Sequence, residues 1–297
     1  MNAAGLAHQL GATRAEGNPN WRAPCPLGCG YGLSFRDSPD GRLLAFCFGG
    51  CEFNAIMTAL VEYGLLDDDG ADLELRPNGR AVPAREDNGE RFRRIEKARK
   101  IYDAGVEDER IATYLRSRCI SLTSPVLRFS EAAPHRTGVR LPAMLAPIVG
   151  VDGAFLGVHM TYLRGDGRGK ADLPKELQRE TRGALKSGTI RLMPLDPARE
   201  LLVCEGIETA FSAAEIFGLP AWSAVFACGL KVAELPPEAA RVVIGMDNDV
   251  SGASQRSALI GRDRWTAEGR SVRLKIPPVP GQDFNDVLIE GRGDARR

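Results

Sequence analysis

Short apolar runs alternate with longer stretches of mixed polarity along the last third of the chain. The runs, of which 201–204 and 242–246 are the clearest, are too short to form helices. Strands that are buried on both faces read as continuous apolar runs, and helices between them produce a parallel sheet. The pattern therefore predicts an α/β fold, with a mostly parallel sheet that carries helices on both faces. The expected strands are 200–205, 221–226, 241–247 and 271–276, and the expected helices are about 208–217 and 253–267.

The pattern is different in the first two thirds of the chain. Residues 52–63 carry apolar side chains at helical spacing, whereas the acidic, glycine- and proline-rich residues after them are typical of a flexible linker. Helices are expected at about 91–100 and 108–118, and two short strands within 146–163. We therefore expect four parts, which are a cysteine-bearing part at 1–66, a linker at 67–90, an α+β domain at 91–195 and the α/β domain at 196–297.

Composition narrows the class of protein. The chain has 297 residues, of which 43% are hydrophobic and 26% are charged, as in globular proteins. Its formal net charge is zero, so any affinity for nucleic acid must come from a local basic surface. No apolar run is long enough to span a membrane, and the first residues lack the pattern of a secretory signal. We therefore expect a cytoplasmic protein without a membrane partner.

Four of the seven cysteines lie in one short, glycine-rich segment. Cys25 and Cys29 form one Cys-x3-Cys pair, and Cys47 and Cys51 form the other. Four thiolates can complete a tetrahedral zinc shell and leave no position open for a substrate. The spacing therefore predicts a structural zinc ion, with free buried cysteines as the alternative.

Between the two cysteine pairs, residues 31–46 are expected to form a hairpin that turns at 39–41. A small domain that a metal stabilises has little core, so one of its faces is available for binding. Aromatic groups there would stack on bases and basic groups would contact phosphates, or the aromatic groups would simply pack around the metal site. The residues concerned are Trp21, Arg22, Tyr31, Phe35, Arg36 and Arg42.

Carboxylates follow the predicted strands of the last domain. Glu205 ends the first strand, Asp247 ends the third, and Asp249 follows two residues later. A further acidic group lies at 283–286. Ligands of open α/β sheets bind at the carboxyl ends of strands, and oxygen-rich acidic clusters bind Mg²⁺. We therefore predict a magnesium site for phosphoryl transfer, although Asp249 or Asp286 taken singly is also a candidate helix cap.

Three other kinds of site fit the sequence poorly. Residues 247–252 resemble the first half of a calcium-binding EF-hand loop, but Ala258 stands where that loop needs a glutamate. Residues 165–171 resemble a phosphate-binding P-loop, but Arg164 and Ala171 stand where it needs Gly and Ser or Thr. The three histidines accompany no nucleophile motif, so a hydrolytic triad is not supported.

Several motifs together resemble one family. The segments 204–206, 247–249 and 283–286 resemble the Toprim domain of bacterial-type primases and topoisomerases, in the variant found in phage and plasmid primases. The cysteine pairs resemble the zinc ribbon of these primases, which uses three cysteines and one histidine. Here Cys29 replaces the histidine, with one extra residue of spacing. The segments 112–118, 141–144, 157–163 and 167–175 resemble the domain that precedes Toprim in mobile-element primases.

The resemblance implies roles for individual residues. Glu205 would be the catalytic or metal-positioning acid, Asp247 and Asp249 would hold Mg²⁺ (or Mn²⁺), and Asp283 would assist. Basic residues of the segment 164–191 would lie near the triphosphate or the template, although a solvated basic face is the alternative for any one of them. The basic candidates are Arg168, Lys170, Lys175, Arg182 and Lys186.

These expectations combine into one hypothesis, a DNA primase that makes short RNA primers from NTPs on a single-stranded DNA template. A 3′-hydroxyl would attack the α-phosphorus of the incoming nucleotide and expel pyrophosphate. Two alternatives remain, which are a Toprim nuclease with the same acids and a non-catalytic replication accessory that binds single-stranded DNA. The sequence carries no helicase motor, so we expect a separate helicase as a partner.

Overall fold

The computed structural model describes residues 3–14, 17–27, 31–38, 41, 43–62, 65, 88–184, 187–226, 229–250 and 252–294. The chain divides into two compact units, Met1–Glu86 and Asp87–Arg297. Most of the predicted linker, 67–90, lies outside the described residues. Among the described residues, no helix combines the length and the apolar character that a membrane crossing requires.

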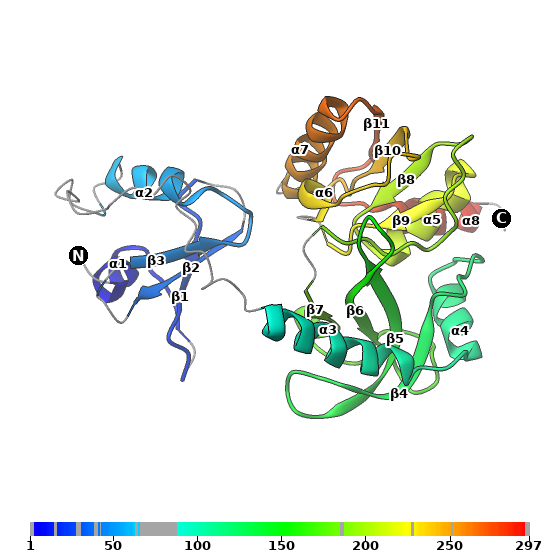
Figure 1. The fold of residues 1–297 in the computed structure, drawn as a ribbon, viewed down its shortest axis with the longest axis horizontal. Coiled ribbons are helices and arrows are strands. Elements are labelled where there is room, and N and C mark those ends of the chain that lie inside the picture. Colours follow the sequence, from blue (N-terminus) through cyan, green and yellow to red (C-terminus); the bar gives the residue numbers. More distant parts are fainter. Residues whose placement is uncertain are drawn as a thin grey trace. The chain divides into compact units, whose positions relative to one another are not determined.

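The first unit is a three-stranded antiparallel sheet with two helices (Figure 1). The predicted hairpin is confirmed, since β2 and β3 pair antiparallel and place Leu33 and Phe35 in the core while alternate residues face outward. The core is small, as expected for a unit of this size. Its elements are α1 (Ala3–Gln9), β1 (Trp21–Pro24), β2 (Gly32–Asp37), β3 (Leu43–Cys47) and α2 (Phe53–Glu62).

The second unit begins with an antiparallel sheet in the order β4-β5-β6-β7. Every residue of β6 is buried, because helix α3 covers one face of the sheet and the other face packs into the main core (Figure 1). The predicted helix at 108–118 is confirmed as α4, and Asp108 caps it by accepting a hydrogen bond from the Arg110 N–H. The elements are α3 (Asn88–Asp103), α4 (Glu109–Ser117), β4 (Arg128–Pro134), β5 (Arg140–Val149), β6 (Phe155–Tyr162), the 3₁₀ turn η1 (Lys175–Leu177) and β7 (Arg179–Gly183).

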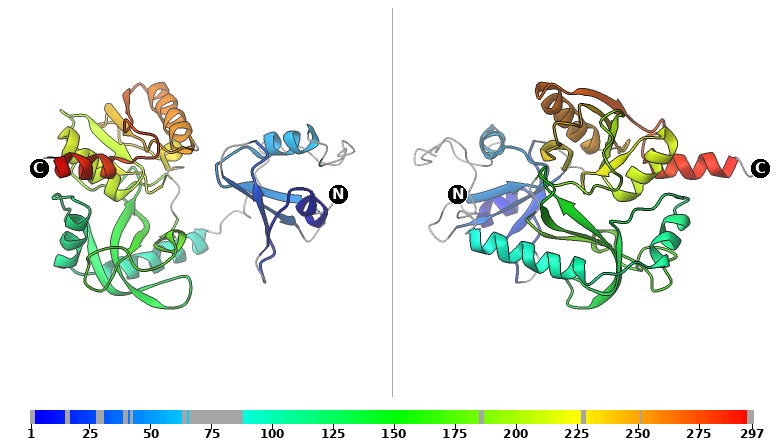
Figure 2. Two further views of the ribbon diagram at one scale, coloured as in Figure 1. Left: turned by 180° about the vertical axis from the view of Figure 1, so that it is seen from behind. Right: turned by 45° about the vertical axis from the view of Figure 1, so that its right-hand side comes forward.

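A four-stranded parallel sheet follows, in the order β11-β10-β8-β9. The helices α5 and α8 pack on one face, and α6 and α7 on the other (Figures 1 and 2). The predicted α/β fold is therefore confirmed, although β9 ends earlier than expected. The elements are β8 (Leu201–Cys204), α5 (Ile207–Phe217), β9 (Ala221–Ser223), α6 (Gly229–Val232), β10 (Arg241–Gly245), α7 (Ala253–Ala267), β11 (Ser271–Lys275) and α8 (Phe284–Asp294).

One apolar cluster joins the two sheets of the second unit. It contains Met144 and Ala146 from the antiparallel sheet together with Leu202 and Phe211 from β8 and α5. Packing of this kind fixes β6 and β7 relative to the strands of the parallel sheet. The finer division of this unit at 195 and 196 stays a prediction.

Candidate active site

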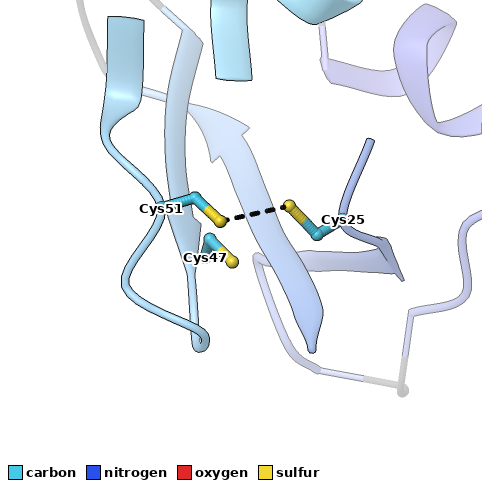
Figure 3. A group of neighbouring side chains, drawn as sticks. All are labelled: Cys25, Cys47 and Cys51. Carbon is cyan, nitrogen blue, oxygen red and sulfur yellow. Dashed lines mark hydrogen bonds between the residues drawn. The ribbon is translucent and has the colours of Figure 1, made fainter. Parts of the chain in front are cut away.

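Three of the four predicted zinc ligands lie together in the first unit. The sulfur atoms of Cys25, Cys47 and Cys51 lie within 4.8 Å of one another (Figure 3). Cys25 and Cys51 are 3.9 Å apart, far beyond the roughly 2.05 Å of a disulfide and close to the ~3.8 Å that two thiolates share across a tetrahedral zinc ion. Cys29, the fourth predicted ligand, lies outside the described residues. The three thiols therefore fit a zinc ion.

The exposed face of the first unit differs from the predicted one. Phe35 is 1% exposed and belongs to the core, so for this residue the packing alternative is correct. Phe46 and Phe48, which were not predicted, are 62% and 40% exposed, and their rings meet edge to face. The Arg22 guanidinium lies 4.2 Å from the centre of the Phe48 ring. Arg42 lies outside the described residues.

In the second unit, predicted acids line one cavity of about 620 Å³. Glu205 follows β8, Asp247 follows β10, and Asp283 precedes α8. β8 and β10 are neighbours, and the helices that follow them cover opposite faces of the sheet, so the acids lie at the point where the strand order reverses. Ligands of open α/β sheets bind at this point.

A serine that the sequence did not single out links these acids. The Ser254 hydroxyl, in the first turn of α7, donates a hydrogen bond to Glu205 Oε1 and accepts one from the Asp247 N–H at 3.0 Å. The Ser254 N–H donates to Asp249 Oδ2 at 2.7 Å, which makes Asp249 part of the cap of α7. Asp247 Oδ1 is buried and has no hydrogen-bond partner in the described part of the chain. A buried oxygen of this kind is the donor that a hard cation such as Mg²⁺ takes.

Burial and mutual repulsion disfavour the charged forms of the carboxylates Asp247 and Glu205 when no cation is bound. Burial raises the pKa of Asp247, and the neighbouring carboxylates Glu205, Asp283 and Asp249 raise it further. Burial also raises the pKa of Glu205, with a contribution from Asp249, against the hydrogen bond from Ser254. A bound divalent cation would remove this repulsion.

Asp283 has a second role in the structure. Its Oδ1 accepts a hydrogen bond from the Asp286 N–H at 2.9 Å, and Asp286 Oδ2 accepts one from the Asp283 N–H at 3.0 Å. This reciprocal pair is a capping box at the start of α8, with Asp283 at the N-cap and Asp286 at the third helical position, so the N-cap is Asp283 and not Asp286. Asp249 also caps a helix and does not line the cavity.

The carboxylates are more widely spaced than the cysteines. Among the described residues, only the cysteine group brings three ligand atoms within 4.8 Å of one another. Mg²⁺ is usually bound by one or two carboxylates, with waters and phosphates as its remaining ligands. The wide spacing of the acids therefore fits a magnesium site of this open kind better than a site made of protein ligands alone. Asp247 and Glu205 are the acids best placed to hold it.

Basic side chains line the same cavity. Lys175 and Arg179 do so without an ion-pair partner among the residues that the structure describes. Lys170 also lines it, and its Nζ lies 2.9 Å from Oε1 of the buried Glu208. Burial alone would raise the pKa of Glu208, but Lys170 and the Tyr114 hydroxyl, which donates at 2.5 Å, hold it well below its usual range.

The other predicted basic residues lie elsewhere. Arg168 is exposed on the turn after β6 and is not part of the cavity lining. Arg182, in β7, pairs with Glu180 at 3.2 Å and is also absent from the lining. Lys186 lies outside the described residues.

Family comparisons bear on both parts of the second unit. Residues 200–293 match the family model described as "Toprim domain". Residues 200–293 are a Toprim domain. The preceding residues, 92–192, match a domain of unknown function, DUF7146. No curated protein matches the sequence.

Three solved structures are similar to this chain over more of its length than the Toprim domain, at low sequence identity. The Aquifex aeolicus primase, with its zinc-binding and RNA polymerase domains, is 14% identical over 98% of this chain and 80% of that one, with a TM-score of 0.43. The RNA polymerase domain of Mycobacterium tuberculosis primase DnaG is 15% identical over 70% and 81%, with a TM-score of 0.40. The primase fragment of the bacteriophage T7 primase-helicase protein is 13% identical over 61% and 66%, with a TM-score of 0.39.

Sequence reasoning missed several residues around the Toprim acids. Glu208 lies in the first turn of α5, where an acidic residue is ordinary, so its pairing with Lys170 gave no signal. His159, in β6, lines the cavity, and burial lowers its pKa to about 4, so its ring is neutral at physiological pH. Neither residue belongs to a motif that spacing alone reveals.

The zinc assignment predicts the metal content of two variants. Cys47→Ser should lose the zinc ion, because three ligands remain at best. Cys119→Ser, at a free cysteine of the second unit, should retain it. Elemental analysis of the purified proteins measures both, and equal zinc content in the two variants would contradict the assignment.

The repulsion at Asp247 predicts a stability effect. In metal-free buffer near pH 8, Asp247→Asn should stabilise the protein by on the order of 1 kcal/mol, or about 2–4 °C in Tm. The pKa of Asp247 is raised in the folded protein, so the carboxyl favours folding at low pH and this contribution is lost as pH rises through the folded pKa. The advantage of the variant should therefore disappear near pH 4.

Thermal unfolding with Mg²⁺ completes this test. Mg²⁺ should raise the Tm of the unmodified protein and have little effect on Asp247→Asn. The matched control is Asp263→Asn, at a mostly exposed carboxylate of α7, which should respond to Mg²⁺ as the unmodified protein does. A Mg²⁺ response that survives in Asp247→Asn rules out this residue as the principal ligand.

The pair of Lys170 with the buried Glu208 predicts strong coupling. Lys170→Met should destabilise the protein by about 3 kcal/mol, because it leaves the buried Glu208 charge without its cation, whereas Glu208→Gln should cost less because the Lys170 side chain is 25% exposed at the cavity. The double variant should be much less destabilised than the sum of the two. Chemical denaturation of all four proteins gives the coupling energy, and additive effects would show that the pair is not a unit.

Proposed function

We propose that the chain is a DNA primase that makes short RNA primers on single-stranded DNA by magnesium-dependent nucleotidyl transfer. One observation carries the proposal, namely that Glu205, Asp247 and Asp283 of the Toprim domain line the same cavity as Lys175 and Arg179. Carboxylates bind divalent cations and basic side chains bind phosphates. A site that joins nucleotides needs both kinds of group around one volume.

The acids divide their work according to their hydrogen bonds. Asp247 keeps one buried oxygen without a partner, and the Ser254 hydroxyl holds Glu205 next to it, so these two would bind the metal. Asp249 and Asp283 each cap a helix, and they would act mainly by adding negative charge around the ion. When bound, Mg²⁺ would offset the charge that develops on the phosphates during transfer.

The basic side chains would bind the phosphates of the nucleotide or of the template. Glu208 holds the Lys170 ammonium at the cavity wall, so the side chain is ordered before a ligand arrives. Lys175 and Arg179 form no close ion pair in the described part of the chain, and the Arg179 charge acts on the nearby carboxylates of Glu205 and Asp247, so both basic side chains would be positioned to meet a phosphate beside the metal. The substrates proposed from this chemistry are NTPs.

The first unit offers a surface for single-stranded DNA. Phe46 and Phe48 are exposed aromatic rings, and Arg22 lies against the second of them. Bases stack on such rings and phosphates pair with such guanidinium groups without dependence on base sequence. We propose that the zinc ion stabilises this surface and that a separate helicase supplies the unwound template.

A primer-synthesis assay tests the proposed activity. With Mg²⁺, NTPs and single-stranded DNA, the protein should make short RNA, and Asp247→Asn should reduce the rate by at least about 100-fold because a metal ligand is lost. Asp263→Asn should keep nearly full activity, since its side chain is 67% exposed on α7. The products are measured by labelled-nucleotide incorporation on denaturing gels.

Two results would contradict the proposal. Cleavage of DNA that needs Mg²⁺ but no NTPs would identify a nuclease. DNA binding without synthesis on any of several templates, unchanged in Asp247→Asn, would identify a non-catalytic accessory.

A further inference from the structure

The cavity of the Toprim domain has one apolar wall among its charged and polar ones. Among the described residues that line it, Val225 and Phe226 are the only ones with apolar side chains. Phe226 is 40% exposed, which is unusual for a large aromatic side chain at the edge of a well-packed sheet. Neither the metal chemistry nor the phosphate binding proposed above uses this wall.

The backbone that carries Phe226 adopts an unfavourable conformation. Val225 has a φ of +73°, a region that β-branched residues rarely enter. Such a conformation is unfavourable for a β-branched residue and persists only where the surroundings impose it. Here it turns the chain out of β9 and places the next side chain at the cavity.

Hydrogen bonds connect this wall to the acidic group. The Ser223 hydroxyl accepts a hydrogen bond from the Val225 N–H at 3.0 Å and donates one to the Glu205 carbonyl at 2.8 Å. The Gly229 N–H donates to the Phe226 carbonyl at 2.8 Å. The position of Phe226 is therefore tied to that of Glu205, which supports a role in the same site.

The order of the strands separates the apolar wall from the metal ligands. β9 and β10 flank β8 on opposite sides, so Phe226 and Asp247 follow strands that lie two strand spacings apart, or about 10 Å. A nucleotide has a charged end and an aromatic end, which its sugar and α-phosphate hold apart by a comparable distance. The cavity thus presents charge on one side and an aromatic ring on the other.

We propose that Phe226 is a nucleobase-binding residue, on whose ring a base stacks while the acids and basic side chains hold the phosphates. This inference rests on the proposed function, because it assumes that a nucleotide occupies the cavity. Stacking uses the face that all bases share, so Phe226 would bind every NTP, and purines more tightly than pyrimidines. The base would belong to the incoming nucleotide or to the DNA strand.

Calorimetric titration of the full-length protein with three probes tests the proposal. The probes are Mg²⁺-ATP, Mg²⁺-tripolyphosphate, which lacks a base, and a short single-stranded DNA. Phe226→Ala should weaken ATP binding roughly 5- to 100-fold and leave tripolyphosphate binding unchanged. Phe226→Trp should restore ATP binding. Ile260→Ala, at an apolar side chain of α7 that is 49% exposed and outside the cavity lining, is the matched control and should change neither.

The outcomes separate this inference from the proposed function. If the unmodified protein binds neither ATP nor tripolyphosphate, the proposed function fails and this inference fails with it. The inference alone is wrong in either of two cases in which the unmodified protein binds ATP and tripolyphosphate. In the first, Phe226→Ala weakens the binding of ATP and of tripolyphosphate equally. In the second, it weakens the binding of neither ATP nor DNA. A loss confined to ATP assigns the base to the nucleotide, and a loss confined to DNA assigns it to the strand. Thermal unfolding of each variant shows that it is folded.

Discussion

Repulsion between partly buried carboxylates at the end of the parallel sheet is the constraint on which the functional account depends. Glu205 and Asp247 follow neighbouring strands, so the sheet brings their charges together where solvent screens them poorly. The Ser254 hydroxyl stabilises the Glu205 carboxylate by donating a hydrogen bond to it and accepts one from the Asp247 backbone N–H, but one carboxylate oxygen of Asp247 keeps no partner among the described residues. A fold that only needed stability would place apolar or paired groups there. A bound divalent cation would remove the repulsion and give the unpartnered oxygen a ligand role.

The rest of the second unit places complementary groups around these acids. One apolar core joins the antiparallel and parallel sheets, so the face of β6 and β7 that carries His159 and Arg179 meets the ends of β8 and β10. Tyr114 and Lys170 converge on Glu208 from α4 and from the turn after β6. The DUF7146 region therefore contributes cavity residues directly, beside those of the Toprim domain.

Much of the fold could be predicted because its strands are buried on both faces and read as apolar runs. β7 could not, since its residues Arg179–Gly183 are largely polar and pair at a cavity edge, so they show no alternation. Phe35 and Phe46 are both phenylalanines in the predicted hairpin, and nothing in the local sequence distinguishes them. The pleat of the paired strands points one to the core and the other to solvent. At the site, strand ends revealed Glu205 and Asp247, whereas the contacts of Ser254 depend on packing that no local pattern records.

The most direct measurement of the central claim is an anomalous-scattering map from crystals grown with Mn²⁺ in place of Mg²⁺. The account predicts an anomalous peak within coordination distance of the unpartnered Asp247 oxygen, with Glu205 beside it. The account would be contradicted if the map showed no anomalous peak beside Asp247 while Mn²⁺ was bound elsewhere in the crystal. It would also be contradicted if the map showed no peak there and the Asp247 side chain had turned to accept a hydrogen bond from a protein donor.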